Sequence, residues 1–213
     1  MASSVRWVVR VTGNFQSETA LNSLAAQALL AALENGWADP KKIGQLPSRA
    51  ANLRNNALES IATNLGVTAD QIEISGEVGL GYFLCLGGFL TPQRKLFYGA
   101  GDRSGVIATA RSHQGDSQII PLNQKGELDF PSFEISKNSV LSFQLSNGET
   151  GAINRLPNKL PSELLIAVDA TASGNRIPLP ENWSSAVFDS RAWEGPAGLA
   201  VAAVIEGISE IVT

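Results

Sequence analysis

The chain is poor in the two residue types that most often hold transition metals. It has one cysteine, Cys85, and one histidine, His113. One cysteine cannot form an internal disulfide or a cysteine-rich zinc site, and one histidine cannot complete a His/Cys cluster, so we expect no metal centre. Cys85 lies inside the apolar run 82–86, which is typical of a small buried thiol and not of a nucleophile. His113 ends a polar helical segment and is expected at the surface.

Charge is also scarce. Asp, Glu, Lys and Arg make up 17% of the 213 residues, the net charge is −4, and the mean hydropathy is +0.03. The sequence has no basic cluster, so we expect neither a nucleic acid nor an anionic lipid as partner. The first ten residues lack the apolar core of a signal peptide, and the longest apolar runs, 79–90 and 199–205, are too short to span a bilayer. We therefore expect a well-buried α/β protein in the cytoplasm, with no membrane contact.

The chain does contain an alternation of short apolar runs and segments of helical period, which predicts an α/β fold. The expected strands are 5–11, 71–74, 95–98, 118–122, 139–145, 164–168, 185–188 and 199–205. The expected helices are 17–36, 48–65, 78–90 and 104–112. In the first helix, Ser17 is the predicted N-cap and Gly36 the predicted C-cap, and Leu24, Leu29 and Leu33 lie on the apolar side.

Two of the apolar runs end in an acid. The run 164–168 ends at Asp169 and the run 185–188 ends at Asp189, and a turn at 195–198 leads into the third run, 199–205. Runs of this kind, bounded by polar residues, are typical of buried parallel strands. Because ligands in open α/β sheets lie beyond the carboxyl ends of the strands, we expect a site residue at Asp169.

The motifs at these strand ends resemble those of the cysteine desulfurases, pyridoxal-phosphate (PLP) enzymes of the class V aminotransferase group. The segment V-D-A-T-A-S-G at 168–174 resembles the family's V-D-A-x-Q-x-x-G, N-G-E-T-G at 147–151 resembles N-N-E-T-G, and G-P-A-G at 195–198 resembles G-P-x-G. The order of the pieces matches over about 20–203. The resemblance implies that residues 1–213 form a single PLP-transferase-like large domain. This is an α/β fold, a three-layer α/β/α sandwich with a mostly parallel, mixed sheet of about seven strands.

The resemblance also implies where the cofactor's ring would lie, and several of those positions have changed. Asp169 matches the acid that pairs with the ring nitrogen, and Asn147 matches the first asparagine of the pair near the phenolic oxygen. Ala172, however, stands where glutamine is usual, and Arg103 stands where a histidine stacks on the ring. Ala192 stands at the position of the lysine that forms the Schiff base.

Further changes surround these positions. Arg191 replaces the histidine that precedes the lysine position. In the turn that resembles the phosphate-binding S-G-A-T-E, Val78 lacks the threonine hydroxyl and Glu77 adds a carboxylate. The chain stops at Thr213, so we expect the small C-terminal domain, with its catalytic cysteine and its substrate-binding arginine, to be absent. The eight positions together form a degenerate remnant of the cofactor site.

PLP chemistry needs a lysine amine and a site that orients the cofactor, so these changes predict that no PLP is bound and that the chain is not an active enzyme. We expect a catalytically inactive, desulfurase-like protein that works as a binding, scaffold or accessory subunit. The resemblance implies a homodimer, and a full-length desulfurase homologue is a second candidate partner. The alternative is a residual PLP-dependent enzyme that uses a relocated lysine or one supplied by a partner chain.

Each remnant residue also has a purely structural interpretation. Asp169 either holds a ring nitrogen or bonds to nearby backbone as a strand-end acid. The turn at 75–79 is either a phosphate cradle or a helix start that Glu77 complements by charge. Arg103 and Arg191 either bind an anionic ligand or form ion pairs. Their candidate ion-pair partners are Asp102, Glu149, Asp169 and Asp189.

Overall fold

The computed structural model describes residues 20–35, 38–132 and 134–205. The strands are β1 (Ile72–Ser75), β2 (Lys95–Gly99), β3 (Ser117–Ile120), β4 (Ser139–Gln144), β5 (Leu165–Asp169), β6 (Ser185–Asp189) and β7 (Ala200–Val204). The α-helices are α1 (Ser23–Asn35), α2 (Gln45–Leu65), α3 (Val78–Cys85) and α4 (Ser104–Ser112). The expected strand at 5–11 and the expected caps Ser17 and Gly36 lie outside the described residues.

The strands form one mixed sheet in the order β1-β7-β6-β5-β4-β2-β3. Strand β7 runs antiparallel to both of its neighbours, β1 and β6. The pairs β2–β3, β2–β4, β4–β5 and β5–β6 are parallel. The predicted fold class, with a mostly parallel sheet of seven strands, is confirmed.

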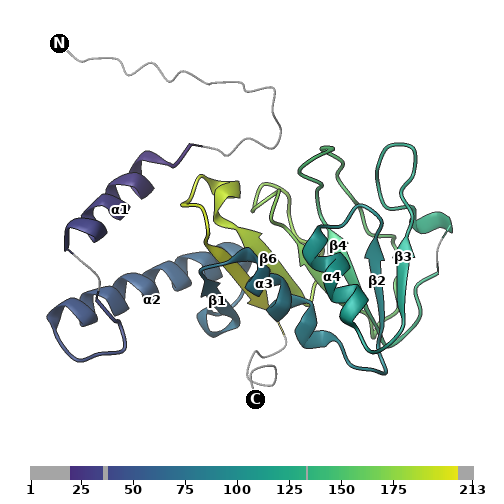
Figure 1. Ribbon diagram of the computed structural model, residues 1–213, viewed down its shortest axis with the longest axis horizontal. Coiled ribbons are helices and arrows are strands. Elements are labelled where there is room, and N and C mark those ends of the chain that lie inside the picture. The colour runs from purple at the N-terminus through teal and green to yellow at the C-terminus, as the bar shows by residue number, and fades with distance from the viewer. Residues whose placement is uncertain (1–19, 36–37, 133, 206–213) are drawn as a thin grey trace, which may run out of the picture.

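The central strands read as continuous apolar runs because both faces of the sheet are covered. Every residue of β4, β6 and β7 is buried. Helices α3 and α4 pack on one face, where Tyr82 and Val106 meet Val187 in one apolar cluster (Figure 1). Helix α2 covers the other face, where Leu58 packs in a second cluster with Phe188. These are the three layers that the sequence predicted.

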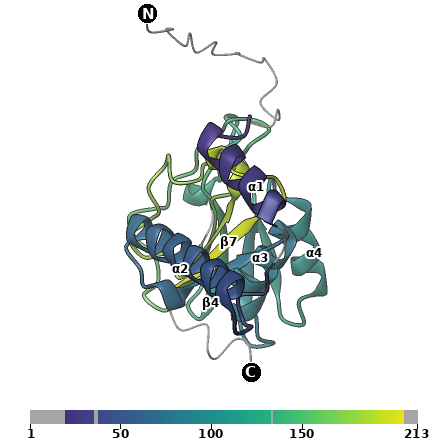
Figure 2. The ribbon, with the colours of Figure 1, turned by 90° about the vertical axis from the view of Figure 1, so that its left-hand side faces the viewer.

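Helix α1 differs from its prediction. Its N-terminus is capped by Asn22, whose Oδ1 accepts a hydrogen bond of 2.9 Å from the Leu24 N–H. The leucines expected on a buried side are exposed, with Leu24 at 73% and Leu33 at 70%. Figure 1 shows α1 and the first turns of α2 at one end of the molecule, away from the sheet, and Figure 2 views that end directly.

Within residues 20–35, 38–132 and 134–205, no helix has both the length and the apolar character needed to cross a membrane. In the same residues, no three His, Cys, Asp or Glu side chains gather into a group that would suit a metal ion.

Candidate functional site

One edge of the sheet collects the carboxyl ends of β1, β2, β4, β5 and β6, because these strands all run in the same direction. Each predicted site residue lies at or just beyond one of these ends. Glu77 follows β1, Arg103 follows β2, Asn147 follows β4, Asp169 ends β5 and Arg191 follows β6. The topology thus brings together, at one edge, residues that are up to 114 positions apart (191 − 77).

Asp169 is buried and its two oxygens already have partners within the chain. Oδ1 accepts hydrogen bonds from the Thr171 N–H at 2.9 Å and from the Thr171 hydroxyl at 2.6 Å. Oδ2 accepts a hydrogen bond of 2.8 Å from the Tyr82 hydroxyl and lies 3.5 Å from Nε of Arg103. The side chain of Asp169 is 3% exposed. It is a strand-end acid bonded to its surroundings, as the structural interpretation predicted.

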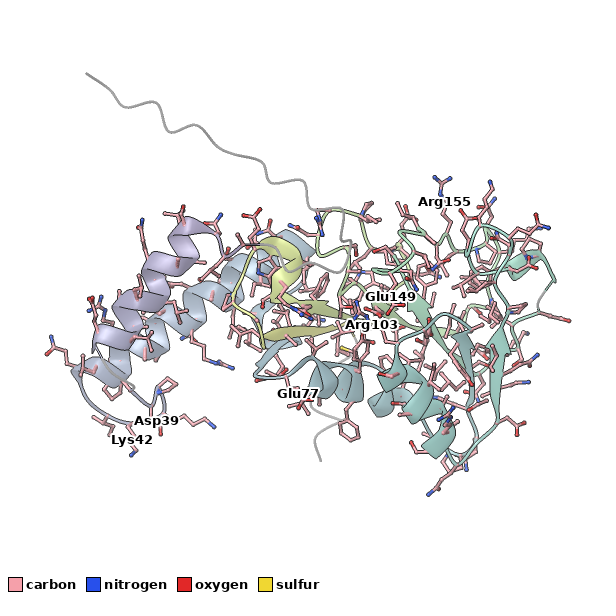
Figure 3. All side chains as sticks on the ribbon, turned by 45° about the horizontal axis from the view of Figure 1, so that its top comes forward. Asp39, Lys42, Glu77, Arg103, Glu149 and Arg155 are labelled. Atoms are coloured by element: carbon pink, nitrogen blue, oxygen red, sulfur yellow. The ribbon has the colours of Figure 1, made fainter. Side chains whose placement is uncertain are left out.

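Arg103 lies in the space next to this carboxylate. It occupies the N-cap position of α4, and its side chain is 40% exposed at the surface of the site (Figure 3). A Cβ atom added to Gly148 would lie 3.3 Å from Cβ of Ala172 and 3.6 Å from Nη2 of Arg103. The two small residues at 148 and 172 therefore leave room for the guanidinium. The sequence did not predict that residue 148 lies beside Arg103.

Asn147 keeps the family's residue type, but its amide is committed to local structure. Its Nδ2 donates to the Gly101 carbonyl at 3.2 Å and to Oε1 of Gln144 at 2.9 Å. Its Oδ1 accepts from the backbone N–H groups of Glu149 and Thr150, both at 2.9 Å. This pattern fixes the turn after β4, and it uses both ends of the amide.

Arg191 forms an ion pair with Asp189, the last residue of β6. Its Nε lies 3.1 and 3.0 Å from the two carboxylate oxygens, and its Nη2 lies 2.6 Å from Oδ2. Ala192 is the next residue, in the short 3-10 helix η4 (Ser190–Trp193). A Cβ atom added to Gly174 would lie 3.2 Å from Cβ of Ala192, so this methyl group packs against the turn that follows β5.

The turn before α3 carries no group that is specific for phosphate. Glu77 is the N-cap residue but makes no side-chain capping hydrogen bond. Its Oε1 lies 2.8 Å from where a Cβ of Gly79 would be, so the carboxylate leans over the first turn of the helix (Figure 3). There it complements the positive end of the helix by charge alone. Val78 is half-buried and packs against the cluster that contains Tyr82.

Two groups beside the site make contacts that sequence reasoning did not predict: Tyr82 was not singled out, and Asp102 was expected only as a candidate ion-pair partner of an arginine. Tyr82 is buried in α3, and its hydroxyl also lies 3.2 Å from Oγ1 of Thr171. Burial raises its pKa well above the ordinary value, and the Asp169 charge raises it further. Asp102 is 7% exposed and accepts hydrogen bonds from the Gly99 N–H and the Ser142 hydroxyl, both at 3.0 Å. Burial raises the pKa of its carboxyl to about 7. For Tyr82, the sequence did hold a signal of such a contact: it is a single tyrosine in an otherwise apolar helix, and the hydroxyl of a buried tyrosine requires a hydrogen-bond partner.

The remaining candidates lie elsewhere. Cys85 is 1% exposed, its Sγ donates to the Ala186 carbonyl at 3.3 Å, and burial raises its pKa to about 12, so it is the buried small side chain that was predicted. His113 is half-buried, with Nε2 at 2.7 Å from the Arg94 carbonyl, so its prediction as a surface residue was wrong. Five lysines are exposed and Lys95, at the start of β2, is half-buried over Phe97.

These residues do not fit a lysine-bound PLP. Position 192 offers a methyl group, Asp169 has partners on both oxygens, and Arg103 stands where a ring would stack. In the described part of the chain, no buried side-chain oxygen or nitrogen lacks a hydrogen-bond partner. The described residues at this edge therefore leave no unpaired buried polar atom for a cofactor to satisfy.

The fold and this strand-end edge define the class of protein: an α/β domain built like the large domain of the PLP-dependent transferases. Among solved structures, the chain is similar to a NifS-like protein, with a TM-score of 0.80 and 17% identity over 92% of this chain and 59% of that chain. It is similar to SspA, solved in complex with cysteine, with a TM-score of 0.79 and 16% identity over 91% of this chain and 60% of that chain.

It is also similar to the cysteine desulfurase CsdA (S-sulfonic acid) from Escherichia coli, with a TM-score of 0.60 and 16% identity over 89% of this chain and 51% of that chain. The chain thus spans between 51% and 60% of the length of these three structures. At this level of identity the likeness establishes the fold, which is that of the NifS-like cysteine desulfurases. No family model and no curated protein sequence matches the chain.

Proposed function

We propose that this chain is a non-catalytic protein with a desulfurase-like fold, which acts by binding a partner and not by converting a substrate. The observation that carries the proposal is Ala192. A methyl group at the position of the Schiff-base lysine removes the amine to which PLP would be tied, and no neighbouring side chain of η4 replaces it. A fold does not imply an activity, and this site argues against the activity of its structural neighbours.

The proposal includes the loss of PLP binding. A ring nitrogen would have to displace Tyr82 or Thr171 from Asp169, and the ring would have to displace Arg103. A phosphate at the start of α3 would approach the Glu77 carboxylate, and two anions so close together repel each other. Each step costs free energy, and no lysine bond at position 192 offsets it.

An activity assay tests the proposal. The purified chain is mixed with PLP and cysteine, and the release of sulfide and alanine is compared with that by free PLP. We expect no difference, and a known cysteine desulfurase assayed in parallel is the control. The alternative, a residual PLP enzyme with a relocated or partner-supplied lysine, predicts a Schiff-base absorption band and sulfide release. The proposal is refuted if both appear and a single Lys→Ala change abolishes them.

We further propose that the binding partner is a second copy of the chain, joined through the exposed apolar side of α1. Leu29, Leu30 and Leu33 lie within one side of this 13-residue helix and are 44%, 61% and 70% exposed. An isolated helix of this length is marginally stable in water, and exposed leucines favour an interface. Glu34 is the only charged residue in the helix, which favours an equally uncharged surface as its complement.

Sedimentation velocity tests the dimer. We expect the full chain to sediment as a dimer and Leu30→Glu together with Leu33→Glu to give a monomer. Ala28→Glu together with Ala32→Glu adds the same two charges at exposed positions of the same helix without removing a leucine and is the matched control. A wild-type monomer at all concentrations contradicts the proposal, and co-purification with a full-length desulfurase homologue instead identifies an accessory subunit. A cytoplasmic location is also part of the proposal, and cell fractionation tests it.

A further inference from the structure

A pocket of about 260 Å³ lies on the α2 side of the sheet, where the carboxyl end of β6 meets η4. It contains none of the eight residues of the cofactor remnant. Its lining comes from α2, β6, β7, η4 and the turn after β5: Ser60, Ile61, Asn64, Leu65, Asn175, Phe188, Trp193 and Val201.

The walls of the pocket are apolar. Phe188 and Trp193 place their ring centroids 6.3 Å apart at an interplanar angle of 55°, and Trp193 keeps 39% of its surface exposed. Ile61, Leu65 and Val201 complete the apolar lining. No lining residue carries a charge. A charged ligand would lose its hydration here without gaining a counter-ion, so the lining selects against charge.

Polar groups line the pocket only where α2 and the turn after β5 are exposed. Within the described residues, the Ser60 hydroxyl and the Asn175 amide make no hydrogen bond. The Asn64 Nδ2 donates to the Ser60 carbonyl at 2.8 Å, which leaves Oδ1 of Asn64 as an acceptor. A few convergent polar groups around an apolar floor are typical of a site that binds a small molecule.

Two parts of the pocket wall meet where Gly174 approaches Ala192, the residue at the position of the Schiff-base lysine. Asn175 and Trp193 are the residues that directly follow Gly174 and Ala192, and these two approach to 3.2 Å at the added Cβ. Gly174 has φ +57°, a conformation that favours glycine. The turn and η4 therefore meet in van der Waals contact at this side of the pocket.

We propose that this pocket binds a small uncharged organic molecule, with an apolar body of about one ring and one amide or hydroxyl group. The volume supports this size, because pockets for drug-sized ligands usually measure about 300–1,000 Å³. The ring stacks on the exposed face of Trp193, which lies beside the buried Phe188, and the polar group bonds to Asn64 and Asn175. The site is independent of the proposed loss of catalysis, since it uses none of the cofactor positions.

Ligand-observed NMR on the full chain tests the proposal with two probes of the same size, benzamide and benzoate. We expect benzamide to bind with a Kd on the order of 1 mM, the range expected for a ligand of so few atoms. Benzoate should bind at least ~5-fold more weakly because its carboxylate meets no cation. Asn64→Phe, which fills the pocket from its rim, should weaken benzamide by at least ~10-fold.

Asn56→Phe is the matched control, because it makes the same change at an exposed position of α2 that does not line the pocket. It should leave the Kd for benzamide unchanged. If Asn64→Phe does not fold, Trp193→Ala removes a wall and should weaken benzamide at least ~5-fold. The proposal is overturned if benzamide does not bind up to about 20 mM, if benzoate binds as tightly, or if neither folded variant weakens binding.

Discussion

The clearest consequence of these internal contacts concerns Tyr82, whose hydroxyl donates a hydrogen bond to Asp169. If Asp169 serves the stability of the chain and not a cofactor, then removing the Tyr82 hydroxyl must destabilise the protein. The hydroxyl lies 2.8 Å from Oδ2 of a carboxylate that is 3% exposed. In Tyr82→Phe that oxygen keeps only Arg103, at 3.5 Å and with a side chain 40% exposed, while Thr171 still bonds to the other oxygen.

The magnitude follows from these contacts. A hydrogen bond to a charged group contributes about 1.5–3 kcal/mol, and a partly exposed ion pair contributes about 1 kcal/mol or less. Arg103 therefore cannot compensate, and we expect Tyr82→Phe to lower the free energy of unfolding by about 2 kcal/mol. Urea denaturation followed by circular dichroism measures this, and the m-value should not change because the same surface is exposed.

The protein supplies its own control. Tyr98 is the only other tyrosine, it is half-buried, and its hydroxyl makes no hydrogen bond within the described residues. Tyr98→Phe should change the stability by less than about 0.5 kcal/mol. If Tyr82→Phe costs no more than Tyr98→Phe, Asp169 does not depend on this bond, and the argument that it is committed to the fold is refuted.

Three further predictions concern Asp102, Cys85 and Gly148. Burial raises the pKa of the folded Asp102 carboxyl to about 7 while the unfolded one ionises near pH 4, so its contribution to stability falls progressively between about pH 4 and pH 7. Asp102→Asn should flatten the urea midpoint between pH 4 and 8. Cys85, with a pKa near 12, should react with Ellman's reagent at pH 8 only after unfolding. Gly148→Asn should crowd Ala172 and Arg103 and cost about 1–3 kcal/mol in a thermal melt.

Most of the fold could be predicted because the strands are buried on both faces and so read as unbroken apolar runs. The acid that ends β5 was identified for the same reason. The predicted ends of helices were less accurate where the residue types at the end decide where the helix stops. The expected helix 78–90 ends at Cys85, because Gly87 and Gly88 follow and glycine destabilises a helix, and a short 3-10 turn continues to Phe89.

The site was predictable in its positions but not in its contacts. Sequence spacing placed Arg103 and Arg191 near acids, yet it left four candidate partners for them. The structure pairs Arg103 with Asp169 and Arg191 with Asp189. Only the packing of α3 against β5 brings Tyr82, 87 residues away, to Asp169. Contacts over such distances depend on the tertiary fold and leave no local pattern in the sequence.

The prediction for helix α1 was right about the helix and wrong about the burial of its leucines. Its apolar spacing predicted a helix, and the helix is there, but the pattern could not say which surface covers its leucines. The described residues of this chain do not bury them, with Leu24 and Leu33 more than two-thirds exposed. An amphipathic pattern reports that a face needs a partner, and it does not report whether the partner is the same chain.

The most direct test of whether this chain can hold PLP as a Schiff base is a covalent labelling experiment. The full chain is incubated with PLP and reduced with borohydride, and peptide mapping then locates each pyridoxyl group. We expect only weak labelling, spread over the exposed lysines and well below one group per chain. One pyridoxyl group per chain, confined to a single lysine, would contradict the account, because it would place a functional Schiff base in a protein whose residue 192 is alanine.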